Sequence, residues 1–173
     1  RYNIPYRLIG GVRFYQRQEV KDIVAYLRII HNPSDEVRFA RIVNTPPRGI
    51  GQRTVDELVR WSRNHQTTLK AAFQAITDKN TEMVDPPPIQ SRAIHAITAF
   101  NEIIDTLRRE APDMSIASLI DAVIQHTNFR NHIFNSDDRG EERWDNVMEL
   151  RATAQRIDDD VTNEPEDKLL LFL

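Results

Sequence analysis

Apolar residues recur every three or four positions along most of this chain, the spacing that places them on one face of an α-helix. The pattern is clearest over residues 16–31, 89–110 and 141–157. Shorter helices are expected over 34–43 and 54–64, from Thr67 or Thr68, from Ser115, around Phe129 and Ile133, and from Pro165 onward, with Ser34, the threonines and Ser115 as N-caps. The sequence therefore predicts an all-α fold.

Two segments interrupt the helical pattern. Tyr6 to Gly11 reads as a short extended strand that ends in two glycines. Residues 77–88 end in Asp85-Pro86-Pro87-Pro88 and read as a loop or disordered segment, because proline cannot continue a helix. At 173 residues the chain fits one domain, so we expect a short extended edge over 1–11 and one helical unit over 12–173.

Between two of the expected helices lies the run Pro46-Pro47-Arg48-Gly49-Ile50-Gly51-Gln52-Arg53-Thr54. The two glycines permit a tight hairpin and a close approach of its backbone to another chain, while Ile50 would anchor it between the helices. If Thr54 begins the second helix, several backbone N–H groups point outward there, where a phosphate can accept them. Together with Arg48 and Arg53, this indicates sequence-independent binding of a nucleic-acid backbone.

The same run also fits a plain turn between helices, with Gly49 as an ordinary C-cap of the first helix. Thr54 followed by Glu57 reads as a capping box, which sets the start of the second helix and is neutral about function. Arg48 and Arg53 favour nucleic-acid binding, because a plain turn has no need of them.

Charge is unevenly spread along a chain whose net charge is −3. Residues 35–70 carry seven basic and four acidic side chains, whereas residues 141–173 carry four basic and ten acidic ones. A basic region around the hairpin and an acidic far end would orient the protein on a polyanion. The alternative is that both regions are solvated helix faces.

Several kinds of chemistry have no signal in the sequence. Glycine occurs only at positions 10, 11, 49, 51 and 140, so no Gly-x4-Gly-Lys-Ser/Thr phosphate loop is present. Cysteine is absent, the five histidines lack metal-site spacing, and the run 158–160 reads as a solvated acidic linker. No apolar run approaches the roughly 20 residues that span a bilayer. These residues predict a binding module with no catalytic or metal site.

A set of short segments carries a family resemblance. They are Ile4-Pro5-Tyr6-Arg7, Gly10-Gly11-Val12-Arg13-Phe14, Arg17-Gln18-Glu19-Val20-Lys21-Asp22, Ala25-Tyr26-Leu27-Arg28, Asn32-Pro33-x-Asp35 and Asn44-Thr45-Pro46-Pro47-Arg48-Gly49-Ile50-Gly51. In this order they resemble the UvrD/Rep/PcrA family of superfamily 1 DNA helicases. The resemblance is dense over residues 4–76 and weaker beyond Ile89, where it rests on Arg143-x-x-Asn146-x-x-Glu149-Leu150 and the leucine-rich end.

The resemblance implies that residues 1–11 are the edge of the second motor domain, 2A, and that 12–173 form the helical 2B subdomain. Its helix-hairpin-helix-like Gly-Ile-Gly motif would contact double-stranded DNA ahead of the junction with the single strand. The DNA-binding positions carried over are Arg48, Gly49, Ile50, Gly51, Gln52, Arg53 and Thr54. Arg17, Glu19, Lys21 and Asp22 would have a structural or interdomain role near the junction, with ion pairing on a helix surface as the alternative.

The parent protein implied by the resemblance is a bacterial, cytoplasmic helicase that hydrolyses ATP with Mg²⁺ and moves 3′ to 5′ in DNA repair or replication. All of its nucleotide-binding motifs would lie outside this chain. Its partners would be DNA, its own motor domains, and repair or replication proteins. Two other readings stay open: a stand-alone helix-hairpin-helix DNA-binding module and a helical protein-interaction domain.

We expect the 173-residue chain to hydrolyse no ATP, with or without DNA, because it lacks the loop that holds the β- and γ-phosphates. Phosphate release measured before and after sizing chromatography tests this. Turnover that co-elutes with the protein would contradict the prediction.

Overall fold

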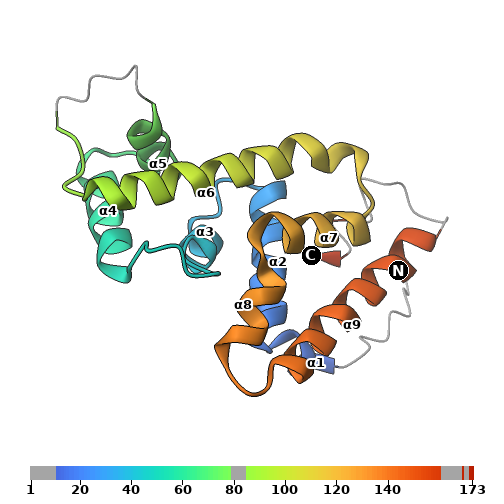
Figure 1. The fold of residues 1–173 in the computed structure, drawn as a ribbon. Coiled ribbons are helices and arrows are strands. Elements are labelled where there is room, and N and C mark those ends of the chain that lie inside the picture. The colour runs from blue at the N-terminus through green and yellow to red at the C-terminus, as the bar shows by residue number, and fades with distance from the viewer. Residues whose placement is uncertain (1–10, 79–84, 161–168, 170–171) are drawn as a thin grey trace.

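The computed structural model describes residues 11–78, 85–160, 169, 172 and 173, and within them it contains helices and no strand (Figure 1). The all-α prediction is confirmed for this part of the chain. In order, its elements are α1 (Gly11–Tyr15), α2 (Gln18–His31), α3 (Glu36–Ile42), α4 (Gln52–Asn64), α5 (Leu69–Thr77), α6 (Ser91–Glu110), the 3-10 turn η1 (Ala111–Asp113), α7 (Ile116–Thr127), α8 (Phe129–Ser136) and α9 (Gly140–Asp159).

The long helix α6 joins the two ends of an elongated molecule. It packs on α5 at one end and on α2 and α7 at the other (Figure 1). Helices α4 and α5 lie at the first end, α7, α8 and α9 lie at the second, and α3 lies between α5 and α2. With 20 residues, α6 is about 30 Å long.

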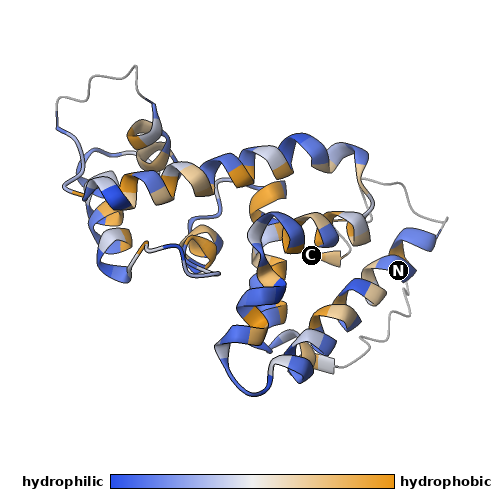
Figure 2. Ribbon diagram, viewed as in Figure 1, coloured by the Kyte–Doolittle hydropathy of each residue, from blue (hydrophilic) through white to orange (hydrophobic). Residues whose placement is uncertain are grey.

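Helix α2 lies at the centre of the second end and contacts α3, α6, α7 and α9. A helix surrounded in this way is apolar on most of its circumference. Figure 2 colours the elements by hydropathy. Val20, Ile23, Tyr26 and Leu27 of α2 are all fully buried. At the other end, Phe39 of α3 makes edge-to-face contacts with aromatic rings of α5 and α6, at 4.6 and 5.3 Å between ring centroids. One continuous core therefore runs through both ends.

Local signals set most helix starts. Thr68 and Ser115 cap α5 and α7 as predicted, their hydroxyls accepting from backbone N–H groups at 3.1 and 3.2 Å. The prediction of Ser34 as the cap of α3 is wrong, because the Asp35 carboxylate accepts from the N–H of Arg38 instead. A carboxylate suits this position because it also meets the positive end of the helix dipole.

Asp158 corrects the prediction that the acidic run 158–160 is only a solvated linker. Its two carboxylate oxygens accept from the N–H groups of Ile116 and Ala117 at 2.9 and 2.8 Å. The end of α9 thus satisfies the first turn of α7, whose N–H groups have no partners within the helix.

A polar network ties α2 to α9. Glu19 is only 4% exposed and accepts from Asn146 Nδ2 at 2.7 Å and from Arg143 Nε at 3.3 Å. Arg17 donates to Asn146 Oδ1 at 2.9 Å. These partners lie in another helix, so the expected structural role of Arg17 and Glu19 is confirmed and pairing along the surface of one helix is not.

Asp22 makes the corresponding link from α2 to α3. Its Oδ1 accepts from Arg41 Nε at 2.8 Å, and the carboxylate is almost completely buried. Burial raises the pKa of Asp22, while the neighbouring Arg41 partly offsets that rise. The structural role expected for Asp22 is therefore also confirmed.

Some predicted features fall outside the described residues. The strand over 6–11 lies there except for Gly11, which begins α1, and the helix from Pro165 lies there except for Leu169, Phe172 and Leu173. The predicted loop begins where α5 ends at Thr77, and its residues 79–84 are not described. The division at residues 11 and 12 stays a prediction. None of the described helices is long and apolar enough to cross a membrane.

We expect Glu19→Ala to lower the free energy of unfolding by about 2–4 kcal/mol, because the change leaves Arg143 and Asn146 without their buried acceptor. Urea unfolding followed by circular dichroism measures this. Glu102→Ala, on the exposed side of α6, is the matched control and should cost no more than about 0.5 kcal/mol. Equal losses in the two variants would contradict the role given to Glu19.

Candidate nucleic-acid interface

The loop between α3 and α4, residues 43–51, contains the Gly-Ile-Gly sequence and is called the hairpin loop below. Ile50 is fully buried in the core, which confirms its predicted role as an anchor. Gly49 has φ of +81°, in the left-handed region that favours glycine. Gly51 has φ −70° and ψ 163° and is the N-cap of α4. The two glycines therefore have different roles.

Helix α4 begins at Gln52, two residues before the predicted start at Thr54. Because Gly51 takes the N-cap position with an extended backbone, Thr54 lies inside the first turn. The predicted Thr54–Glu57 capping box requires Thr54 at the N-cap and is therefore wrong. No side chain caps the start of α4 through a hydrogen bond.

Asn44 organises the hairpin loop. Its Oδ1 accepts from the backbone N–H of Arg48 at 2.7 Å and from that of Ile50 at 3.1 Å. These two N–H groups therefore face the protein and are not available to a ligand. Sequence reasoning gave Asn44 no role, although asparagine commonly bonds to the backbone of a following turn.

Other N–H groups of this region remain free. Among the described residues, no acceptor meets the N–H groups of Gly49, Gly51, Gln52, Arg53 or Thr54. The last three form the first turn of α4, at the positive end of the helix dipole. A Cβ built on Gly51 would meet nothing within 4 Å, so the space beside this backbone is open.

Arg48 faces inward, whereas the resemblance places it among the DNA-binding positions. Its Nη1 donates to the carbonyl oxygens of Ile42 and Val43 at 2.9 and 3.2 Å, and its Nη2 donates to Tyr26 Oη at 2.5 Å. Its guanidinium carbon lies 4.9 Å from the centre of the Phe100 ring. The physical reason is that α3 ends here with carbonyl groups that need donors.

Tyr26 completes this arrangement from the central helix. Its hydroxyl donates to the carbonyl oxygen of Thr45 at 2.6 Å while it accepts from Arg48. Burial raises the pKa of Tyr26 to about 12, with Arg48 opposing the rise. The phenol therefore keeps its proton and bridges the loop to α2.

Arg53 and Gln52 lie on the surface at the start of α4. The Arg53 side chain is 93% exposed, and its Nε lies 3.2 Å from Glu57 Oε1 one turn along the helix. Gln52 Nε2 donates to Asp56 Oδ1 at 2.8 Å. Exposed pairs of this kind contribute at most a few tenths of a kcal/mol, so a phosphate can replace the carboxylate partner of Arg53.

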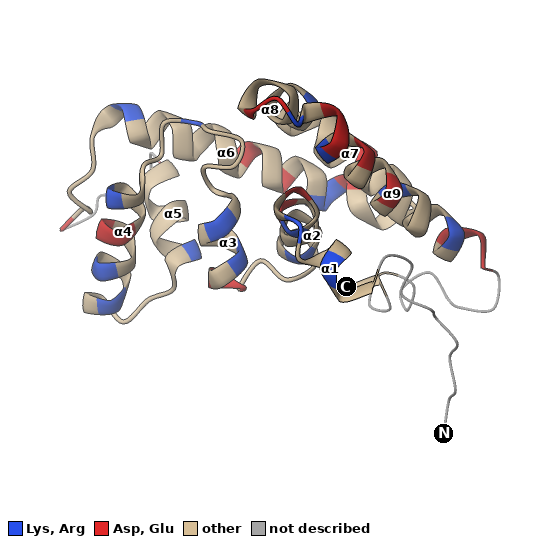
Figure 3. Ribbon diagram, turned by 90° about the horizontal axis from the view of Figure 1, so that it is seen from below, with Lys and Arg blue, Asp and Glu red and all other residues tan. Residues whose placement is uncertain are grey.

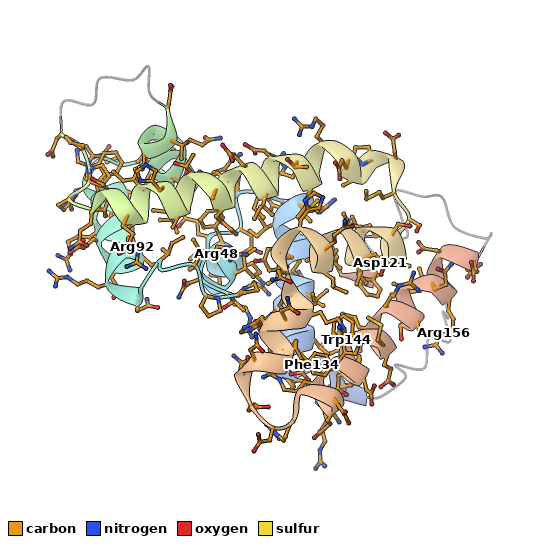
Figure 4. The ribbon with its side chains drawn as sticks, viewed as in Figure 1. Arg48, Arg92, Asp121, Phe134, Trp144 and Arg156 are labelled. Atoms are coloured by element: carbon orange, nitrogen blue, oxygen red, sulfur yellow. The ribbon has the colours of Figure 1, made fainter. Side chains whose placement is uncertain are left out.

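Arg92 is a residue that sequence reasoning missed. It is the second residue of α6 and is labelled in Figure 4. Its Nε would lie 3.9 Å from a Cβ built on Gly49. Its distance along the chain from the hairpin loop hid this proximity. Only the packing of α6 across the molecule brings the two together.

Charge follows the two ends of the molecule. Figure 3 shows several Lys and Arg residues along α3 and α4, and most of the Asp and Glu residues of the other end belong to α9. The uneven distribution read from the sequence therefore becomes a separation in space.

Within the part of the chain that the structure describes, other polar clusters give no competing site. A cavity of about 500 Å³ between α2, α8 and α9 is lined by Arg17, Glu19, His132, Asp137, Arg143 and Asn146, among others. Most of these polar groups bond to each other in the α2–α9 network. Among the described residues, no group of three His, Cys, Asp or Glu side chains could hold a metal ion.

Comparison with known proteins gives a consistent result. Residues 1–173 match the family described as the UvrD-like helicase C-terminal domain. DNA helicase II of Haemophilus influenzae is 39% identical over 166 residues, covering 95% of this chain and 22% of that protein. ATP-dependent DNA helicase UvrD1 of Mycobacterium tuberculosis is 38% identical over 164 residues, which are 94% of this chain and 20% of the relative.

A more distant relative is ATP-dependent DNA helicase PcrA of Bacillus subtilis. It is 29% identical over 169 residues, which are 97% of this chain and 21% of that protein. The chain thus spans about a fifth of the length of each of these relatives.

The inward position of Arg48 distinguishes it from Arg53 in a stability measurement. We expect Arg48→Ala to lower the free energy of unfolding by about 2–3 kcal/mol, because two carbonyl groups and the Tyr26 hydroxyl lose a donor. Arg53→Ala should cost no more than about 0.5 kcal/mol. Thermal and urea unfolding of both variants test this, and equal effects would refute the structural role of Arg48.

Proposed function

The chain belongs to the family of the UvrD-like helicase C-terminal domain, and from this we propose that it is the 2B region of an ATP-dependent DNA helicase. In this proposal residues 1–11 are the edge of motor domain 2A and residues 12–173 are the 2B subdomain. ATP and Mg²⁺ bind to other parts of the parent enzyme. The parent moves 3′ to 5′ in DNA repair or replication in the bacterial cytoplasm, and 2B meets the duplex ahead of the junction.

The observation that carries the proposal is the group of unpaired N–H donors at the start of α4. The N–H groups of Gln52, Arg53 and Thr54 point along the helix axis, where a phosphate oxygen can accept them. Gly51 places no side chain in front of them. A phosphodiester can therefore approach to hydrogen-bond distance.

Some hairpin residues form the binding surface, and others hold the loop in position. Arg53 adds a flexible guanidinium beside the helix start, and the Gln52 and Thr54 side chains border the same surface. Ile50 and Arg48 hold the loop in place from inside. Because phosphates are the same in every sequence, this site grips the DNA backbone without reading bases.

Helicase relatives that are about five times longer favour this reading over a stand-alone helix-hairpin-helix module. A helical protein-interaction domain, in which the hairpin is only a turn, would bind its partner without a marked dependence on these N–H groups. The experiment below separates the two.

We expect the protein to bind duplex DNA weakly, with a log–log salt slope of roughly −2 to −3 for two or three phosphate contacts. Two unrelated duplexes should bind with similar affinity. Fluorescence anisotropy over a salt series measures both quantities. A strong preference for one sequence, or a slope near zero, would contradict backbone binding at the hairpin.

Gly51→Val should weaken this binding severalfold, because the added side chain would stand before the free N–H groups. Its backbone angles and open surroundings allow a branched side chain, so the fold should survive. Ala152→Val, on the exposed face of α9, is the matched control and should bind as the unchanged protein does. Unchanged affinity in Gly51→Val with an intact fold would leave the hairpin as a turn.

A further inference from the structure

The inward position of Arg48 leaves one side of the hairpin loop without the positive charge that the sequence predicted there. All of the Arg48 contacts described above go to the protein interior. At the loop surface beside Gly49, the cation provided by the fold is instead Arg92 of α6.

Two features make Arg92 available to a ligand. Its side chain is exposed, and among the described residues no hydrogen bond or ion pair engages it. Gly49, which it adjoins, has a free N–H group and no side chain, so a phosphate can reach the loop backbone and the guanidinium together.

Helix α6 fixes this arrangement. Phe100, two turns after Arg92, is fully buried and stacks on the guanidinium of Arg48. The same helix thus holds one arginine inside the loop and presents another outside it (Figure 4). Since α6 packs on α5 and α2, Arg92 starts from a defined position beside Gly49.

We propose that Arg92 is a second phosphate-binding residue of the hairpin site, gripping a phosphodiester next to the one held by the start of α4. The inference rests on the proposed function, since it extends the same duplex-binding surface. A guanidinium presents several N–H donors in one plane, which match two oxygens of a phosphate. The site is therefore built from two segments of the chain, the hairpin and the first turn of α6.

The test compares Arg92→Ala, Arg92→Lys and Arg109→Ala in duplex binding by the purified protein over a salt series. Arg109 is exposed near the other end of α6 and is the matched control for removing one arginine from this helix. Losing one phosphate contact should reduce the magnitude of the salt slope by about 1. If the binding lines meet at 1 M salt, affinity at 0.1 M falls roughly eightfold.

We expect Arg92→Ala to show this loss, Arg92→Lys to recover most of the slope, and Arg109→Ala to match the unchanged protein. The thermal unfolding midpoints of all three should stay near that of the unchanged protein. If the unchanged protein binds duplex but Arg92→Ala has the same slope and affinity, the role of Arg92 is refuted while the proposed function stands. If the unchanged protein binds no duplex, both are refuted.

Discussion

The insertion of the Arg48 guanidinium among Tyr26, Phe100 and the end of α3 is the interaction on which the candidate site depends. Burying the carbonyl groups at a helix end without hydrogen-bond donors costs free energy. A guanidinium has five donors in a fixed plane, so one side chain can serve Ile42, Val43 and Tyr26 while its face rests on an aromatic ring. The cluster joins α2, α3, α6 and the hairpin loop.

A loop held in this way can present its backbone without folding further when a ligand arrives. Asn44 removes two N–H groups from the surface, and the helix geometry of α4 leaves three others pointing outward. Binding then costs little ordering entropy, because the donors already stand in place. Gly49 takes a positive φ because the chain reverses its direction there before Ile50 enters the core.

The sequence predicts what depends on neighbours along the chain and misses what depends on packing. Helical spacing located α2, α6 and α9, and local hydrogen bonding identified the caps Thr68 and Ser115. The inward turn of Arg48 could not be predicted, because its partners include Tyr26 and Phe100 on distant helices. The proximity of Arg92 to Gly49 and the bond from Asp158 to the start of α7 have the same origin. The sequence contains these residues but does not indicate which distant residues they contact.

Salt limits the distance over which the charges of the protein act. Helix α6, about 30 Å long, leads from the α4–α5 end of the molecule to α7, while the Debye length at physiological salt is about 8 Å. Carboxylates near the C-terminal end of α9 lie far from the start of α4 (Figure 1) and repel a phosphate there only weakly, so the net charge of −3 does not by itself oppose binding at that point. These carboxylates would repel a duplex that tilted toward α9. If the chain binds duplex DNA as proposed, local contacts at the starts of α4 and α6 would therefore decide its orientation more than the net charge would.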